Sequence, residues 1–241
     1  MKTHQHWFHK TFVTIFILAI SFVAMVPATS HSQDPEDELG NWLIYNGTVR
    51  FSDQWSLFTE AQIRLWDVVS DLNEVFVRAA GHYDLPNSPA MVGLGYMRSD
   101  TWPYGDGSRE VIENRIYQQF GIHQTWARSL FDHRYRLEER WRDRGEKTDF
   151  SIRVRYRLQV TTPLNRETME PGAHFLNFYD EIFITFDDPR VFDQNRLYGA
   201  WGYQFTRMAN LQLGLLWQAR PTGDFFRLQI FYTHNFDLRD G

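Results

Sequence analysis

The sequence predicts an all-β protein, a closed antiparallel barrel that spans a membrane, and three observations carry this prediction. Apolar and polar residues alternate along almost the whole chain after residue 40, which is the period of a strand and not of a helix. The alternating segments are mostly about 10–13 residues long, whereas ordinary strands have about 5–6 residues and membrane-spanning strands about 9–11. The N-terminus has the pattern of a segment that directs export.

That N-terminal segment begins with basic residues, Lys2 and Lys10, and contains no acid before residue 34. The apolar run 12–26 is shorter than the roughly 20 residues of a spanning helix, and small residues follow it. We therefore expect a signal peptide over 1–30, cleaved near Ser30 or Ser32. An acidic tail over 31–40 and a barrel over 41–238 follow.

The composition excludes several classes of protein. The chain of 241 residues has no cysteine, which rules out disulfides, thiolate metal sites, a cysteine nucleophile and a lipidated cysteine. Its formal charge is -5, and loss of the signal peptide would make it more acidic, so we expect no nucleic-acid partner. Only Lys2, Lys10 and Lys147 are lysines, and the remaining basic residues are arginines, which suit paired and partly buried charge.

Eleven segments alternate. They cover roughly 41–51, 55–66, 73–83, 91–100, 111–124, 130–141, 149–160, 174–186, 196–205, 210–219 and 225–236. Bacterial single-chain barrels have even strand numbers, so we predict 12 strands, with 10 as the alternative. The boundary would then be hidden in 161–173, which contains Pro163 and Pro171, or in the first segment. The connections are expected to alternate between short turns at one rim and longer loops at the other.

Each segment has one apolar face and one polar or charged face, and this difference predicts which face points into the barrel. Trp55, Leu57 and Ile63 share one face of their segment, and Glu60 and Arg64 lie on the other. An arginine facing the middle of a bilayer costs about 2–4 kcal/mol, so the charged faces should point inward. Aromatic residues near strand ends fit the two interfacial girdles of a membrane barrel. These are Trp55, Trp126, Trp141, Trp201, Tyr203, Trp217 and Tyr232.

The inward faces form a candidate charge network, densest on two successive segments. Its predicted members are Glu60, Arg64, Arg134, Arg136, Glu138, Arg140, Arg153, Arg155, Arg157, Glu181 and Arg196, with Glu74 and Glu113 as further inward acids. One interpretation is a salt-bridge network that fills a narrow interior, since buried charges are tolerated when paired. The other is a series of arginines that binds or conducts an anion.

The sequence gives little support for catalysis or for a cofactor. It lacks a GxSxG or HExxH motif, so we predict no enzyme, no cofactor and no metal site. Two alternatives remain open. An outer-membrane lipid-modifying enzyme would need a histidine with a serine or acid, and His82 with Asp84 and Ser88 or His133 are the candidates. A soluble periplasmic barrel for an apolar ligand would instead turn its aromatic residues inward and its arginines outward.

A loop rich in acids was also considered as a cation site. Asp187 and Asp188, with Asp193 beyond them, could hold calcium, although loops with several acids are common.

Four stretches together resemble the bacterial domain of unknown function 2490 family. They are HRYRLEERW at 133–141, YDEIF at 179–183, FDQNRLYGAWGYQF at 192–205 and the opening stretch 40–64, and the resemblance covers about 39–238. It implies a barrel of the bacterial outer membrane with no established activity, and it carries over no catalytic residue. Outer-membrane lipid and the barrel-assembly machinery are then the expected partners.

Overall fold

The computed structural model describes residues 39–105, 107–186 and 191–239. The predicted signal peptide and residues 31–38 of the predicted tail lie outside this range, as do Asp187 and Asp188. The described part of the chain contains no helix with the length and hydropathy of a membrane span.

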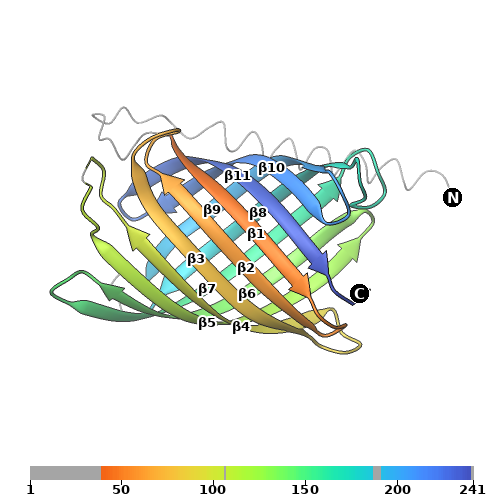
Figure 1. Cartoon of the computed structure of the whole chain (residues 1–241), viewed down its shortest axis with the longest axis horizontal. Coiled ribbons are helices and arrows are strands. Elements are labelled where there is room, and N and C mark those ends of the chain that lie inside the picture. The colour runs from red at the N-terminus through yellow and green to blue at the C-terminus, as the bar shows by residue number, and fades with distance from the viewer. Residues whose placement is uncertain (1–38, 106, 187–190, 240–241) are drawn as a thin grey trace. The chain divides into compact units, whose positions relative to one another are not determined.

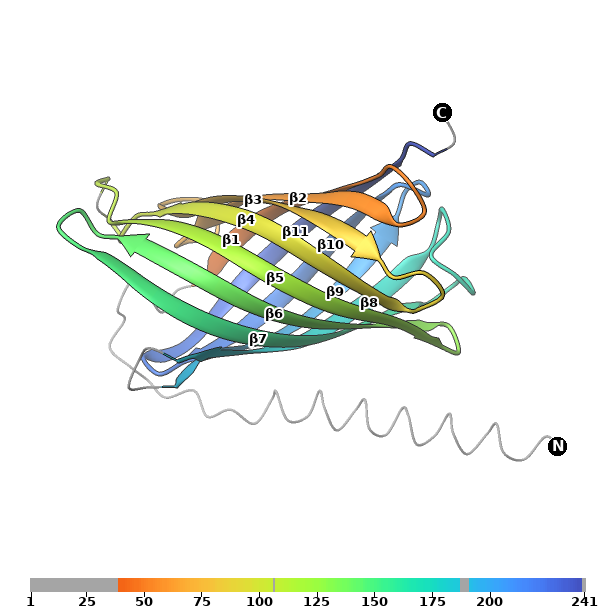
Figure 2. The same cartoon turned by 90° about the horizontal axis from the view of Figure 1, so that it is seen from below.

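The described residues form eleven strands that close into one barrel (Figures 1 and 2). Each strand pairs in antiparallel fashion with the next along the chain, and β1 closes the ring on β11. The all-β closed barrel is thereby confirmed. The strands are β1 (Gly40–Arg50), β2 (Trp55–Leu65), β3 (Leu72–Asp84), β4 (Ala90–Thr101), β5 (Val111–Trp126), β6 (Ser129–Asp143), β7 (Thr148–Pro163), β8 (His174–Thr185), β9 (Phe192–Gln204), β10 (Ala209–Arg220) and β11 (Gly223–Asp237).

The strand number is eleven, so the prediction of 12 or 10 strands is wrong, and so is a wholly antiparallel sheet. Each alternating segment of the sequence is one strand, and the suspected extra strand in 161–173 is the end of β7 followed by a loop. An odd number of up-and-down strands makes the first and the last run in the same direction. β1 and β11 are therefore parallel, paired from Gly40↔Arg227 to Arg50↔Asp237.

The barrel has two rims, named here for the described ends of the chain that lie at them. The N-terminal rim, where β1 begins, carries the connections that follow β2, β4, β6, β8 and β10. The C-terminal rim, where β11 ends, carries 51–54, 85–89, 127–128, 164–173 and 205–208. Each rim has both short and long connections, so the expected division into a rim of turns and a rim of loops is wrong.

Burial follows the alternation of the sequence. Outward side chains such as Leu94, Trp55 and Leu213 are 61%, 55% and 50% exposed, whereas Arg136 and Arg153 on the inner faces are 4% and 5% exposed. The two faces of every strand thus meet different surroundings, and the polar faces enclose the space in which the candidate site lies.

Candidate functional site

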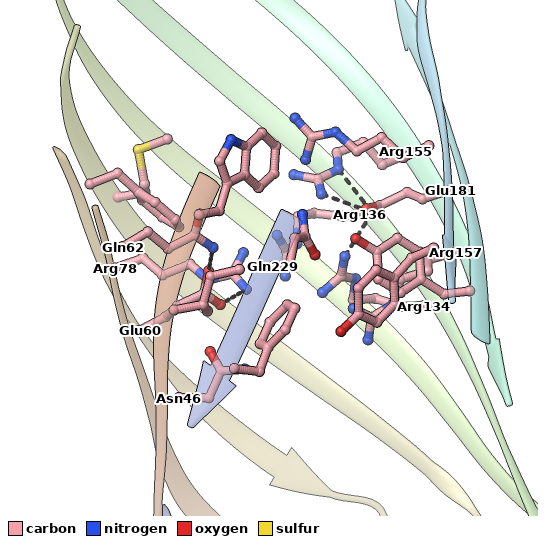
Figure 3. A pocket seen from close by; sticks show the side chains of 18 of the residues that line it. Asn46, Glu60, Gln62, Arg78, Arg134, Arg136, Arg155, Arg157, Glu181 and Gln229 are labelled. Carbon is pink, nitrogen blue, oxygen red and sulfur yellow. Dashed lines mark hydrogen bonds and ion pairs between the residues drawn. The ribbon is translucent and has the colours of Figure 1, made fainter. Parts of the chain in front are cut away.

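A cavity of about 1310 Å³ occupies the interior of the barrel (Figure 3). Side chains from all eleven strands line it, because every strand turns one face inward. The lining also includes Pro221 and Arg144 at the N-terminal rim and Met169 and Arg207 at the C-terminal rim. The cavity therefore extends along the barrel from one rim to the other.

The charge of this lining is strongly positive. Among the described residues, sixteen arginines and eight carboxylates line the cavity, an excess of eight positive charges. The excess is seven when Glu138, buried behind three of these arginines, is counted with them, and the whole chain has a formal charge of -5. Arginine keeps its charge at any ordinary pH, so this excess does not depend on protonation.

Glu138 on β6 is the centre of the ion pairs in the barrel wall. It is fully buried and accepts hydrogen bonds from Arg115 Nη1 (3.2 Å), Arg153 Nε (2.8 Å) and Arg155 Nη1 (2.7 Å). β5, β6 and β7 are neighbours in the sheet, so these side chains come from adjacent strands. Burying an unpaired carboxylate costs much free energy, and the three cations around Glu138 offset this cost.

The same network continues to both sides of Glu138. Arg155 Nη2 also donates to Glu181 on β8 (2.8 Å), and Arg134 Nη2 donates to the same oxygen (2.7 Å). On the same side, Asp193 on β9 accepts from Arg153 Nη1 (2.8 Å). On the other side, Glu113 on β5 accepts from Arg115 and Arg140. One connected set of charges thus joins five strands.

A second, smaller group of ion pairs lies on β2 and β3. Arg78 pairs with Glu60, which faces it directly across the two strands and also accepts from Gln62 (Figure 3). Arg64 pairs with Glu74 in the same way. Within the sheet only β4 separates this group from β5, the nearest strand of the network around Glu138.

Aromatic rings support many of the inward guanidinium groups. Arg64 stacks over Trp42 at 3.9 Å, Arg155 over Phe183 at 4.2 Å and Arg136 over Tyr117 at 4.3 Å, measured from the guanidinium carbon to the ring centroid. Arginine stacks favourably on such rings. Sequence reasoning missed the inward aromatic residues, although the strict phase of each strand places Phe183 on the same face as Glu181.

The structure places all eleven predicted charged residues on inward faces but joins only some of them. Arg134, Glu138, Arg140, Arg153, Arg155 and Glu181 belong to the connected network, and Arg136 Nη1 is 3.8 Å from Glu138. Glu60 and Arg64 belong to the separate group. Arg157 and Arg196 instead lie over aromatic rings, at 5.6 Å from Tyr179 and 4.8 Å from Phe183.

Sequence reasoning missed three partners of this network. Arg78 and Arg115 follow the inward phase of β3 and β5, so continuing the alternation would have found them. Asp193 was considered as part of a calcium loop, but it lies on β9 and pairs with Arg153. The pairing of β8 and β9 shifts register near its position, so alternation alone does not assign its side.

The histidines considered for catalysis have other contacts. His82 faces the cavity and stacks on Phe58 (5.8 Å between centroids), and the Ser88 hydroxyl accepts a hydrogen bond from the Ala90 amide. His133 is hydrogen-bonded to the Tyr156 hydroxyl (2.9 Å). Among the described residues no group of three or more His, Cys, Asp or Glu side chains is arranged to hold a metal ion.

Comparison with known proteins gives one match. The family described as "Protein of unknown function (DUF2490)" matches residues 39–229, which is most of the chain and nearly the whole barrel. Searches of curated proteins and of solved structures found no significant match.

Proposed function

The chain belongs to the DUF2490 family of proteins of unknown function, and we propose that it is an outer-membrane barrel whose interior admits small anionic solutes. The role is passive, without a catalytic residue. The observation that carries the proposal is the excess of eight positive charges along a cavity that reaches both rims.

The outer surface supports a membrane location. Leucine, valine and isoleucine side chains are exposed along the strands, and Val77, Leu94 and Leu213 are each at least half exposed. Such a continuous apolar surface is rare on a soluble monomer. Trp55, Trp126 and Trp201 are exposed on the same surface near strand ends, where aromatic residues meet lipid headgroups. A closed ring of backbone hydrogen bonds also leaves no sheet edge, as a bilayer requires.

The inward charges support a preference for anions. A cavity lined mostly by one sign of charge concentrates solutes of the other sign, and rings of arginine favour anions in pores. The soluble alternative would place arginines outside and aromatic residues inside, and the buried arginines argue against it.

Recording from the barrel in a planar bilayer tests the proposal. Protein that shows the heat-dependent gel migration of a folded barrel should pass current, and its reversal potential in a KCl gradient should indicate that chloride crosses more readily than potassium. Arg157→Gln should reduce this preference because it removes an inward charge. Arg98→Gln should not, because Arg98 lies on the outer face beside Asp100.

Two results would overturn the proposal. Folded protein that passes no current would leave a purely structural barrel, closed by its ion pairs. A preference for potassium would contradict the argument from the lining charge.

A further inference from the structure

Four arginines on β6 and β7 form a block at the middle of the cavity wall. Arg134 faces Arg157 directly across the two strands, and Arg136 faces Arg155 in the same way. Directly opposed like charges destabilise a sheet, so a stable arrangement needs compensating charge nearby. Strand alternation predicts that these four residues face inward, but the pairing of arginine against arginine comes from the register.

The carboxylates near the block do not match it in number. Glu181 serves both Arg134 and Arg155, and Glu138, which also serves Arg155, is shared with Arg115 and Arg153. Arg136 donates Nη2 to the neutral amide of Gln119 (2.6 Å), and the one ion pair that the structure describes for it is the longer contact of Nη1 with the same Glu138 (3.8 Å). Arg157 faces Glu181 across β7 and β8, but no ion pair of Arg157 is found among the described residues.

Several donors of the block also lack hydrogen-bond partners. Within the described part of the chain, Nε of Arg134, Arg136 and Arg157 and Nη1 of Arg136 are buried without one. Arg136 is only 4% exposed and lines the cavity. Gln229 projects from β11, on the opposite side of the ring, and neither of its buried amide atoms has a partner (Figure 3).

We propose that Arg134, Arg136 and Arg157 form a binding site for a phosphate group, as the free ion or as a small phosphate monoester. This inference rests on the proposed function, because the ligand reaches the site through the cavity. Water could satisfy the free N–H groups but not the unpaired charge, whereas an oxyanion satisfies both. Guanidinium forks match phosphate oxygens in geometry, and a doubly charged ion suits a block with several arginines and one facing carboxylate, Glu181.

The site makes an unusual prediction for Arg157→Gln. If Arg157 only supported the barrel, its loss would lower stability. Arg157 opposes the like charge of Arg134 on β6 and the opposite charge of Glu181 on β8, with which it forms no described ion pair, so these two effects on stability offset each other. We therefore expect the variant without phosphate to unfold at nearly the same temperature as the wild type. The same variant should bind phosphate at least about tenfold more weakly, because it loses a charge-assisted contact.

The experiment uses the detergent-solubilised barrel. Its unfolding temperature, monitored by gel migration, is measured as a function of the concentration of sodium phosphate. Sodium chloride at equal ionic strength is the control for screening, and Arg98→Gln is the control variant. Phosphate should raise the unfolding temperature of the wild type and of Arg98→Gln with saturation, and chloride should not. Glycerol phosphate, titrated separately, distinguishes a monoester ligand from the free ion.

This readout needs no current, so it separates the two proposals. Barrel that conducts anions but gains no stability from either phosphate compound would overturn the site and leave the proposed function standing. Equal stabilisation of the wild type and Arg157→Gln, or stabilisation of the wild type by chloride alone, would also overturn the site. Stabilisation by phosphate in a barrel without current would support the site and overturn the proposed conduction.

Discussion

Replacing Glu138 by glutamine should strongly destabilise the barrel. Glu138 is fully buried and accepts three hydrogen bonds, one each from Arg115, Arg153 and Arg155. Removing one partner of a buried ion pair costs about 3–5 kcal/mol, and three cations lose their shared counter-charge here. For a chain of this size each kcal/mol lowers the unfolding temperature by roughly 2–4 °C, so we expect a decrease of about 10 °C or more.

The next residue provides a matched control. Glu139 is on the outer face of β6, between Ile116 and Ile152 in the register, so Glu139→Gln removes the same charge without touching the network. Its unfolding temperature should stay the same or rise, because an apolar surface does not favour a carboxylate. Gel migration after heating measures both variants. Equal shifts of the unfolding temperature in the two variants, or no shift in Glu138→Gln, would refute the reasoning. If Glu138→Gln folds poorly, the double variant with Arg115→Gln should recover part of the lost stability.

Three further predictions concern the barrel itself. Epitope tags inserted in 102–110 and in 164–173 should be accessible from opposite sides of a sealed vesicle, because these loops lie at opposite rims; access from one side would contradict a spanning barrel. Leu213→Arg should reduce assembly into a bilayer by about 2–4 kcal/mol, since Leu213 is exposed on the outer face, and wild-type assembly would contradict a lipid-facing surface. Gly202→Ala should lower stability by about 1–3 kcal/mol, because its Cβ would lie 2.2 Å from the Phe175 ring, whereas Gly81→Ala meets nothing within 4 Å and should unfold like the wild type.

The sequence predicted most of this fold because strand alternation is a local property. Each of the eleven segments is one strand, and the phase assigned to Arg136 or Glu181 holds along its strand. The predicted strand number is wrong because it follows the rule that bacterial barrels have even strand numbers, whereas the sequence itself contains eleven alternating segments. Closure in parallel between β1 and β11 depends on the whole ring, so no segment of the sequence could reveal it.

It is easier to predict from the sequence which residues belong to the site than which of them pair with one another. Alternation says that Arg157 points inward, but only the register shows that it lies between Arg134 on β6 and Glu181 on β8. Likewise, Glu138 and Glu139 are neighbours in sequence, and only the phase of β6 separates a buried hub from a surface residue. Pairing across strands depends on register, and register is set by turns and by the pairing of distant segments.

The net charge of the chain was a poor indicator of what the interior would bind. Among the described residues, sixteen bases but only eight acids line the cavity, although the whole chain has more acids (30) than bases (25). A barrel separates these populations because successive residues of a strand face opposite sides. A solute inside meets only the charges that face it, so an acidic protein can enclose a positive interior. The overall charge argues against nucleic acid at the outer surface, and it places no limit on small anions within the ring.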